Sequence, residues 1–279
     1  LLYSLFYLFG YGIEKEDLAS FRQLDSKTPG HPEYAVTPGV EISTGPLGQG
    51  LASAVGMAMA EARLAAEFNR EGFEIVDHYT YVLTGDGCLQ EGVTHEACSF
   101  AGTQKLGKLI VIYDRNKITI EGSTDLAFDE DVAARYKAYG WQVLEVADAN
   151  DLAAISTALD AAKAEKEKPS LIIVQSKIAF GSPLEGLAKT HGSPLGEENV
   201  AATKKALGWP EDLGIFELPS SLQEGMKQVR HELAEDERAW RELFSRWKKA
   251  WPELAARWDQ TFHPDFTGLN EALFREIPS

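Results

Sequence analysis

Four short apolar segments alternate with segments of helical character, and this alternation is what most narrows the possible folds. The apolar segments are Tyr79–Thr84, Lys108–Tyr113, Trp141–Val146 and Ser170–Gln175. Their β-branched and aromatic composition predicts strands. Nearly continuous apolar strands separated by helices are typical of a parallel sheet covered on both sides. We therefore expect an α/β fold with a parallel β-sheet flanked by helices on both faces.

Segments with helical character lie before, between and after these strands. The predicted helices are Gln49–Asn69, Gln90–Ala101, Asp129–Tyr139, Asn150–Lys166 and Glu197–Leu207. The first residues, LLYSLFYLFGYG, predict a buried helix that is too short to span a bilayer. They also lack the basic flank and cleavage site of a signal peptide.

The last part of the chain differs in composition from the rest. Residues 219–262 are densely charged, with Trp and Leu spaced three and four apart, which predicts one or two long helices with a narrow apolar stripe. We expect an α/β domain over residues 1–214 and a helical C-terminal extension over residues 215–279. Because residue 1 is not methionine, we also expect the gene product to begin further upstream.

The charge balance and the cysteine count restrict the partners. The chain has 43 acidic and 27 basic side chains, which give a net charge of −16. This balance argues against nucleic acid, whose phosphates need a basic surface, and no membrane partner is expected. A small phosphorylated ligand remains possible, because a metal ion and oriented amides reverse the local charge. Cys88 and Cys98 form neither a disulfide framework nor a metal site, which favours a reducing, cytoplasmic setting.

One aspartate stands between two glycines just after the first predicted strand. Gly85, Asp86 and Gly87 follow Thr84 in the stretch VLTGDGCLQEG. Taken alone, Gly-Asp-Gly is most often a plain turn. The alternative is functional: glycines allow a sharp turn and the close approach of a ligand where a strand leads into a helix.

A second polar side chain follows the next predicted strand. Asn116 comes thirty residues after Asp86, beyond Lys108–Tyr113 and two further polar residues, Asp114 and Arg115. Neighbouring parallel strands would bring both side-chain oxygens to one crevice. Mg²⁺ prefers oxygen ligands and often uses one or two protein side chains together with phosphates. Asp86, Asn116 and a nearby carbonyl such as that of Ile118 are thus candidates to hold Mg²⁺ against a diphosphate.

Six sequence blocks resemble the transketolase family in the order of that family. They are TPGHPE at 28–33, STGPLGQG at 43–50, GDGCLQEG at 85–92, YDRNKITIEG at 113–122, FDEDVAARYKAYGW at 128–141 and HGSPLG at 191–196. Gly-Asp-Gly followed by Asn116 is similar to the thiamine diphosphate motif. The resemblance extends to about Leu207 and is less distinctive after Phe216. It implies the thiamine diphosphate-binding fold.

The resemblance also implies roles for individual residues. The implied ligands of Mg²⁺ or Ca²⁺ are Asp86, Asn116 and the carbonyl of Ile118. The residues implied to contact thiamine diphosphate are Gly45, Pro46, Leu47, Gly87, Asn116 and His191. His31 and His191 are the implied catalytic residues, lining the channel to the reactive carbon. Glu91 is implied to join a carboxylate network between the two cofactor sites of a dimer.

The implied activity is transfer of a two-carbon ketol group from a ketose phosphate, such as xylulose 5-phosphate, to an aldose phosphate. Relative to the family, an upstream histidine segment, the pyrimidine-binding domain and the C-terminal domain are missing. We therefore expect a fragment or one subunit of a split enzyme, with a pyrimidine-binding partner and a second copy. Two alternatives stay open: a dihydroxyacetone synthase-like enzyme, and a non-catalytic regulatory module that binds thiamine diphosphate.

Overall fold

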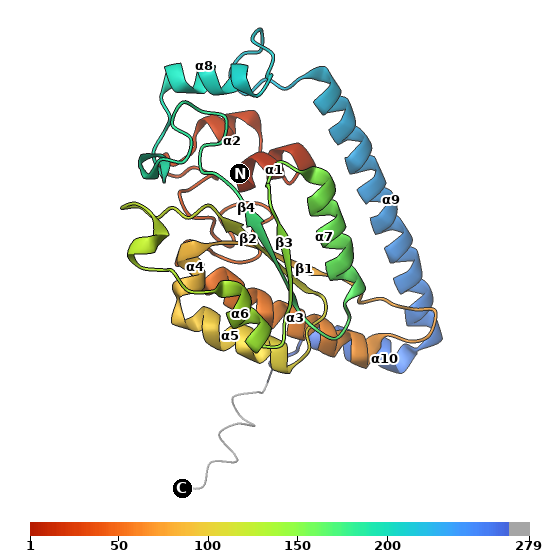
Figure 1. The fold of residues 1–279 in the computed structure, drawn as a ribbon. Coiled ribbons are helices and arrows are strands. Elements are labelled where there is room, and N and C mark those ends of the chain that lie inside the picture. Colours follow the sequence, from red (N-terminus) through yellow and green to blue (C-terminus); the bar gives the residue numbers. More distant parts are fainter. Residues whose placement is uncertain (268–279) are drawn as a thin grey trace, which may run out of the picture. The chain divides into compact units, whose positions relative to one another are not determined.

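The computed structural model describes residues 1–267, and its centre is a parallel sheet (Figure 1). The strands are β1 (Thr80–Gly85), β2 (Leu109–Arg115), β3 (Gln142–Val146) and β4 (Ser170–Gln175). Their order is β1-β2-β4-β3, and every neighbouring pair is parallel. The predicted parallel sheet is confirmed.

Helices precede, connect and follow the strands. They are α1 (Leu2–Phe9), α2 (Lys15–Ala19), α3 (Gln49–Phe68), α4 (Asp86–Gln90), α5 (Gly92–Thr103), α6 (Val132–Ala138), α7 (Leu152–Ala164), α8 (Glu197–Ala206), α9 (Ser220–Ala250) and α10 (Pro252–Phe262). Short 3₁₀ turns occur at Thr124–Leu126 and Ala188–Thr190. One or two long helices were predicted over 219–262, and the helices α9 and α10 confirm this.

Both faces of the sheet bury apolar side chains because residues alternate along each strand. On β4, Leu171 and Ile173 belong to a core formed with α3, α5 and α6, whereas Ile172 and Val174 belong to a core formed with α7. Full burial of one such side chain contributes about 1.5–3 kcal/mol. The helices on the two faces in Figure 1 therefore stabilise the sheet from both sides, as predicted.

Helix caps explain two boundaries that sequence patterns placed too early. Asp131 accepts a hydrogen bond from the Ala134 amide at 2.9 Å, and Asp151 accepts one from the Ala154 amide at 2.9 Å. Each aspartate is the N-cap, so it lies outside the helix that it starts. The helices predicted from Asp129 and Asn150 accordingly begin at Val132 and Leu152.

Two further boundary predictions were wrong. The helix predicted over Gln90–Ala101 is interrupted at Glu91, which has extended backbone angles, φ −67° and ψ 134°. Helix α4 therefore ends at Gln90, and α5 begins at Gly92. Strand β2 also continues beyond Tyr113. Asp114 and Arg115 pair with Val174 and Gln175 of β4, so their polar side chains do not end the ladder.

The first segment is helical, as predicted, but it is not buried. Within α1 only Tyr3 is buried, and its hydroxyl donates to the Pro29 carbonyl at 2.6 Å. Leu2, Leu5 and Phe9 are each more than a third exposed. A single face of α1 is therefore covered by the described part of the chain.

The described chain forms two compact units. The larger contains Leu1–Ala62 and His78–His231, with the whole sheet. The smaller contains Arg63–Asp77 and the chain from Glu232 onward. Its core is aromatic: Phe68 and Trp247 are fully buried, and the Trp247 indole donates to the Phe68 carbonyl at 3.0 Å. The predicted division into an α/β domain over residues 1–214 and a helical extension over residues 215–279 stays a prediction.

Candidate functional site

The predicted metal ligands Asp86 and Asn116 lie just past the carboxyl ends of two neighbouring strands, β1 and β2. In the ladder between β1 and β2, Gly85 is level with Asp114, so both strands end side by side. Asp86 is the first residue of α4 after β1, and Asn116 is the first residue after β2. The structure therefore brings these two positions to neighbouring strand ends, where ligands bind in parallel sheets.

The two carboxylate oxygens of Asp86 differ in their hydrogen bonds. The residue is 5% exposed, and the Tyr113 hydroxyl donates to Oδ1. Oδ2 is buried and has no hydrogen-bond partner within the described part of the chain. Burial raises the pKa of Asp86, and the hydrogen bond from Tyr113 opposes that shift. A buried oxygen without a donor is costly unless a cation or another donor reaches it.

The loop after β2 presents two more oxygens. Asn116 is half-buried, and its Oδ1 accepts a hydrogen bond from the Ile118 amide at 2.9 Å. Lys117 between them has φ 61°, a left-handed conformation. Backbone hydrogen bonds from Thr124 to Lys117 and from Thr119 to Gly122 close the loop. These bonds do not use the Ile118 carbonyl.

This donor set fits a hard divalent cation. All three groups offer oxygen, and the only carboxylate among them has an unpartnered atom. Residues 1–267 contain no cluster of three or more His, Cys, Asp or Glu side chains suited to a metal. A site with one carboxylate therefore depends on additional oxygens, and the oxygens of a bound diphosphate are suitable.

Glycines allow three separate loops to approach one another. Gly45 has φ 144°, and a Cβ at this position would overlap the ring of His31. A Cβ on Gly87 would lie 3.1 Å from Cδ1 of Leu47. The loop containing Gly45 and Leu47 thus touches both the His31 loop and the residue after Asp86. Glycine at positions 45 and 87 permits these close approaches, because a Cβ atom would occupy the space that His31 and Leu47 fill.

The same loop reaches the junction between α4 and α5. Gly48 has φ 78°, and a Cβ there would lie 2.8 Å from Cβ of Glu91 and 2.8 Å from Oγ1 of Thr94. The Thr94 hydroxyl donates to the Cys88 carbonyl at 2.8 Å, which fixes the junction. The Glu91 side chain is exposed, so its carboxylate is available to a partner. Pro46 leads into α3 through a hydrogen bond from the Gln49 amide to its carbonyl.

His191 is the predicted residue that the structure does not join to the others. It follows the 3₁₀ turn Ala188–Thr190, is exposed, and donates its backbone amide to the Ala188 carbonyl at 2.9 Å. Within the described residues it forms no hydrogen bond with His31. The structure therefore gathers His31, Gly45, Leu47, Gly87 and Asp86.

A cavity of about 110 Å³ adjoins the Asp86 side chain, and Tyr113, Arg115 and Lys117 also line it. A larger cavity of about 700 Å³ lies between the turn linking α1 to α2 and the start of α9. None of the predicted site residues lines the larger cavity. We place the candidate site at the smaller one because Asp86 lines it.

Sequence reasoning missed two residues that support this region. Tyr113 donates to Asp86, and burial together with that hydrogen bond raises the pKa of its hydroxyl, so it remains a donor. Arg135 of α6 donates to the Leu89 carbonyl of α4 at 3.0 Å and pairs with Glu130 at 2.9 Å. The sequence signal for Tyr113 was its polar hydroxyl at the end of the predicted apolar strand Lys108–Tyr113. Arg135 gave no comparable signal.

A protein-family model shows to which class of proteins this chain belongs. A family model described as "Transketolase, thiamine diphosphate binding domain" matches residues 1–265. The fold is thus that of a thiamine diphosphate-binding α/β domain. The chain belongs to the transketolase family, which confirms the resemblance in its sequence blocks.

Individual relatives agree with this assignment. Transketolase of Streptococcus pyogenes serotype M6 is 54% identical over 248 residues, covering 88% of this chain and 34% of the relative. Transketolase 1 of Escherichia coli K12 is 50% identical over 246 residues, covering 88% of this chain and 37% of the relative. The chain therefore spans between a third and two fifths of the length of these relatives.

Solved structures give the same result. A Pichia stipitis transketolase in complex with sedoheptulose 7-phosphate has a TM-score of 0.90 and 46% sequence identity, covering 93% of this chain and 38% of that chain. Transketolase from Leishmania mexicana has a TM-score of 0.90 and 46% identity, covering 93% and 39%.

Proposed function

We propose that this chain forms the diphosphate-binding part of a transketolase. The complete enzyme transfers a two-carbon ketol group reversibly from a ketose phosphate, such as xylulose 5-phosphate, to ribose 5-phosphate or erythrose 4-phosphate. This reaction belongs to the pentose phosphate pathway. The observation that carries the proposal is the buried, unpartnered Oδ2 of Asp86 beside the glycine contacts of Gly45 and Gly87. Relatives about half identical to this chain are named transketolases.

In this proposal, oxygen ligands from two strand ends hold Mg²⁺ or Ca²⁺. The ligands are Asp86, Asn116 and the carbonyl of Ile118. Contacts with thiamine diphosphate come from Gly45, Pro46, Leu47, Gly87, Asn116 and His191. The amides at the start of α4 suit a diphosphate. When bound, thiamine diphosphate supplies a nucleophilic carbon and accepts the electron pair released by carbon–carbon cleavage.

The two histidines act on the sugar in this proposal. His31 and His191 hydrogen-bond the hydroxyls and the reacting carbonyl oxygen, and they hold or move protons near neutral pH, which suits imidazole. The contact between His31 and Gly45 supports this role, since it fixes the ring beside the proposed cofactor loop. For His191 the support is its position in the HGSPLG block.

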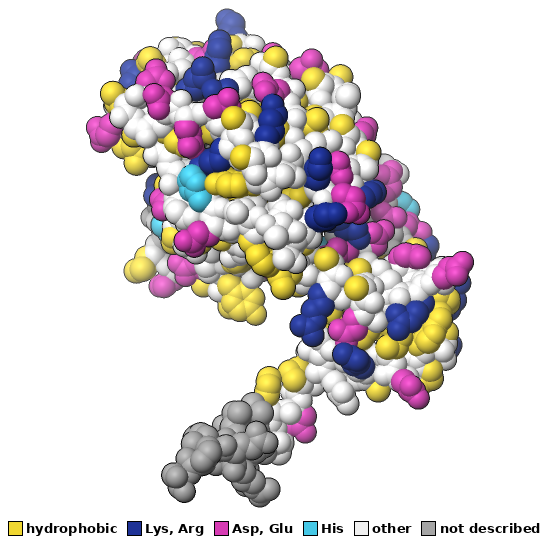
Figure 2. Space-filling view, turned by 60° about the horizontal axis from the view of Figure 1, so that its bottom comes forward, with side chains coloured by type: hydrophobic (Ala, Val, Ile, Leu, Met, Phe, Trp, Pro, Cys, Tyr) yellow, Lys and Arg dark blue, Asp and Glu magenta, His cyan; other side chains and the backbone are white. Residues whose placement is uncertain are grey.

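Further partners complete the proposed enzyme in the cytoplasm. A pyrimidine-binding domain or subunit covers the other half of the cofactor, and a second copy forms the dimer in which Glu91 joins a carboxylate network. The net charge of −16 disfavours nucleic acid. On the face drawn in Figure 2, basic side chains lie among acidic ones instead of forming one basic patch. Among residues 1–267, no helix has the length and apolar character needed to cross a membrane.

The first test is a calorimetric titration of the chain with thiamine diphosphate and Mg²⁺. We expect binding that disappears when Mg²⁺ is omitted and when Asp86 is replaced by Asn. Asp114→Asn is the matched control, because it removes one exposed carboxylate from the same edge of the sheet. Binding that survives Asp86→Asn, or that is lost equally in both variants, contradicts the proposed metal site.

The second test concerns the reaction. With a pyrimidine-binding partner supplied, the assembly should convert xylulose 5-phosphate and ribose 5-phosphate, and the pure chain alone should not. Binding of thiamine diphosphate without conversion of these sugars would contradict the substrate assignment. Conversion with formaldehyde as the preferred acceptor would indicate a dihydroxyacetone synthase-like enzyme instead.

A further inference from the structure

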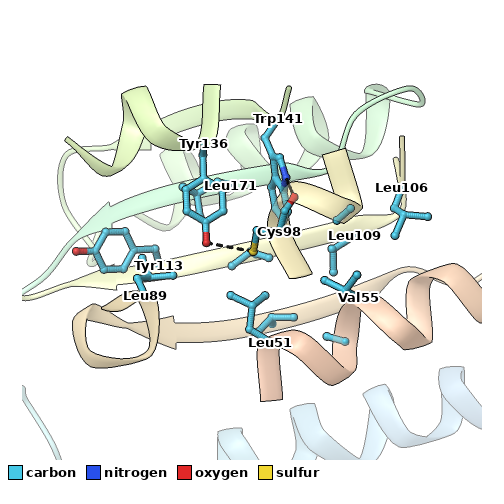
Figure 3. Close-up of a cluster of buried hydrophobic side chains, with 14 of the residues drawn as sticks. Leu51, Val55, Leu89, Cys98, Leu106, Leu109, Tyr113, Tyr136, Trp141 and Leu171 are labelled. Carbon is cyan, nitrogen blue, oxygen red and sulfur yellow. Dashed lines mark hydrogen bonds between the residues drawn. The ribbon is translucent and has the colours of Figure 1, made fainter. Parts of the chain in front are cut away.

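A second cavity in the larger unit is not used by the proposed function. The core drawn in Figure 3 packs its own side chains against one another, whereas a space of about 700 Å³ stays open beside the start of α9. Three segments of the larger unit surround it: the turn between α1 and α2, residues 213–218 and the first turns of α9. Its volume is that of a small-molecule site, for which about 300–1,000 Å³ is usual.

One part of the lining is cationic. Lys227 and Arg230 are three residues apart on α9 and therefore lie on the same face of that helix. Lys15, at the start of α2, also lines the cavity. Within residues 1–267, the side chains of Lys15 and Lys227 form neither an ion pair nor a hydrogen bond. Their ammonium groups are therefore available to a ligand.

Arg230 is held across the end of α1. Gly10 caps this helix with φ 79°, and a Cβ there would lie 3.2 Å from Cδ of Arg230. Nη1 of Arg230 donates to the Leu8 carbonyl at 2.9 Å. Because a guanidinium carries N–H donors on three nitrogens, this contact fixes the side chain and still leaves donors for a ligand.

The carboxylates that line the cavity already have partners in their own turns. Glu14 accepts a hydrogen bond from the Asp17 amide, and Oε2 of Glu217 accepts one from the Gly214 amide at 2.9 Å. The lining thus contains three cationic and two acidic side chains, in a chain whose net charge is −16. This local excess of positive charge favours an anionic ligand.

Another part of the lining is aromatic and is held in a strained conformation. Phe216 has φ 58°, which is rare for a bulky residue. The turn that imposes this angle is closed by the Glu217 amide, which donates to the Gly214 carbonyl at 3.2 Å. Phe216 is 41% exposed and lines the cavity together with Tyr7. Strain of this kind persists where the surrounding structure enforces it, and it is frequent at ligand sites.

We propose that this cavity binds a small organic phosphate that carries a planar ring, such as a nucleoside monophosphate. The phosphate lies against Lys227 and Arg230, and the ring lies against Phe216. A phosphomonoester carries a charge of about −1.5 to −2 at neutral pH, which matches cations from more than one segment. Arginine and lysine hold phosphates through charge-assisted hydrogen bonds, and aromatic side chains stack on planar rings.

This site is separate from the proposed diphosphate site, because none of the residues predicted to bind the cofactor lines the cavity. Binding here therefore requires neither thiamine diphosphate nor a metal ion. A titration without Mg²⁺ consequently tests the cavity independently of the proposed function.

The experiment is a calorimetric titration of the chain, without Mg²⁺, using adenosine monophosphate and phenyl phosphate as probes. Both should bind. Adenosine lacks the phosphate and should bind at least about tenfold more weakly than its monophosphate. Inorganic phosphate lacks the ring and should also bind about tenfold more weakly.

Single variants then locate the ligand. Lys227→Gln should weaken binding of adenosine monophosphate about tenfold, the usual effect of losing one charge-assisted hydrogen bond. Lys205→Gln in α8 is the matched control, because Lys205 is likewise exposed and does not line the cavity. It should leave the affinity unchanged. Phe216→Ala should weaken adenosine monophosphate but not inorganic phosphate, a difference that a loss of folding would not produce.

Four results would overturn the proposal. The first is that neither probe binds at millimolar concentration, and the second is that adenosine binds as tightly as its monophosphate. The third is that Lys205→Gln and Lys227→Gln have equal affinities. The fourth is that Asp86→Asn abolishes binding while Lys227→Gln retains it, which would place the ligand at the candidate diphosphate site instead.

Discussion

The ring of His31 lies against Gly45 so closely that a Cβ at position 45 would overlap ring atoms. This contact joins the TPGHPE and STGPLGQG blocks, which are separate in sequence. It also places one predicted catalytic side chain directly on the loop predicted to bind the cofactor.

Replacing Gly45 by Ala should destabilise the fold and weaken thiamine diphosphate binding. Gly45 has φ 144°, which L-residues rarely adopt, and the added methyl group displaces His31. We expect a loss of about 1–3 kcal/mol in the free energy of unfolding. Urea unfolding followed by circular dichroism measures it. Gly56→Ala in α3 is the control, because nothing lies within 4 Å of its Cβ and helix propensity favours alanine there.

Gly87→Ala should separate binding from stability. Its Cβ would meet only Cδ1 of Leu47, a half-exposed and movable side chain, at 3.1 Å. We expect a small change in the free energy of unfolding, below about 1 kcal/mol, with a much larger loss of diphosphate affinity. Gly92→Ala, where nothing lies within 4 Å, should affect neither. Equal affinities for the two variants would show that no ligand approaches position 87.

The ion pair between Lys108 and Glu61 should be sensitive to loss of one partner. The two side chains are 2.5 Å apart, and that of Glu61 is 3% exposed. Lys108→Met leaves a buried carboxylate without this cation, which should cost about 3 kcal/mol of stability. The double variant with Glu61→Met should recover most of that loss. A double variant no more stable than Lys108→Met would contradict this explanation.

The thiol of Cys98 should be inert in the folded chain. Burial raises its pKa from 9.0 to about 11, while the hydrogen bond with Tyr136 opposes the shift. Iodoacetamide at pH 8 should therefore modify Cys88, which is half-buried, and leave Cys98 unmodified, as mass spectrometry would show. Rapid modification of Cys98 in folded protein would contradict the burial.

The same shift predicts how stability depends on pH. Because the pKa of Cys98 is higher in the folded state than the ordinary 9.0, its contribution to stability is complete below pH 9. That contribution is lost as pH rises from about 9 to about 11. Comparing urea unfolding of the chain and of Cys98→Ala across this range measures it. The variant should show the smaller decline.

Parts of the fold were predictable because they depend on local patterns. Ser170–Gln175 was predicted with the bounds that β4 has, since a continuous apolar run between turn residues determines a buried strand. The end of β2 was not predictable. Asp114 and Arg115 look like loop residues, yet pairing with β4 keeps them in the strand. Backbone pairing with a distant segment outweighed their local preference.

Sequence by itself determined the family, the parallel sheet and the positions of Asp86 and Asn116 at strand ends. These follow from motif order, and from the rule that consecutive apolar strands joined by helices run parallel. Only the tertiary structure decided that Tyr113 holds Oδ1 of Asp86, that His31 rests on Gly45 and that Leu47 touches Gly87. Each of these contacts joins residues at least fourteen positions apart. Their geometry depends on how whole layers pack, and no local pattern in the chain records it.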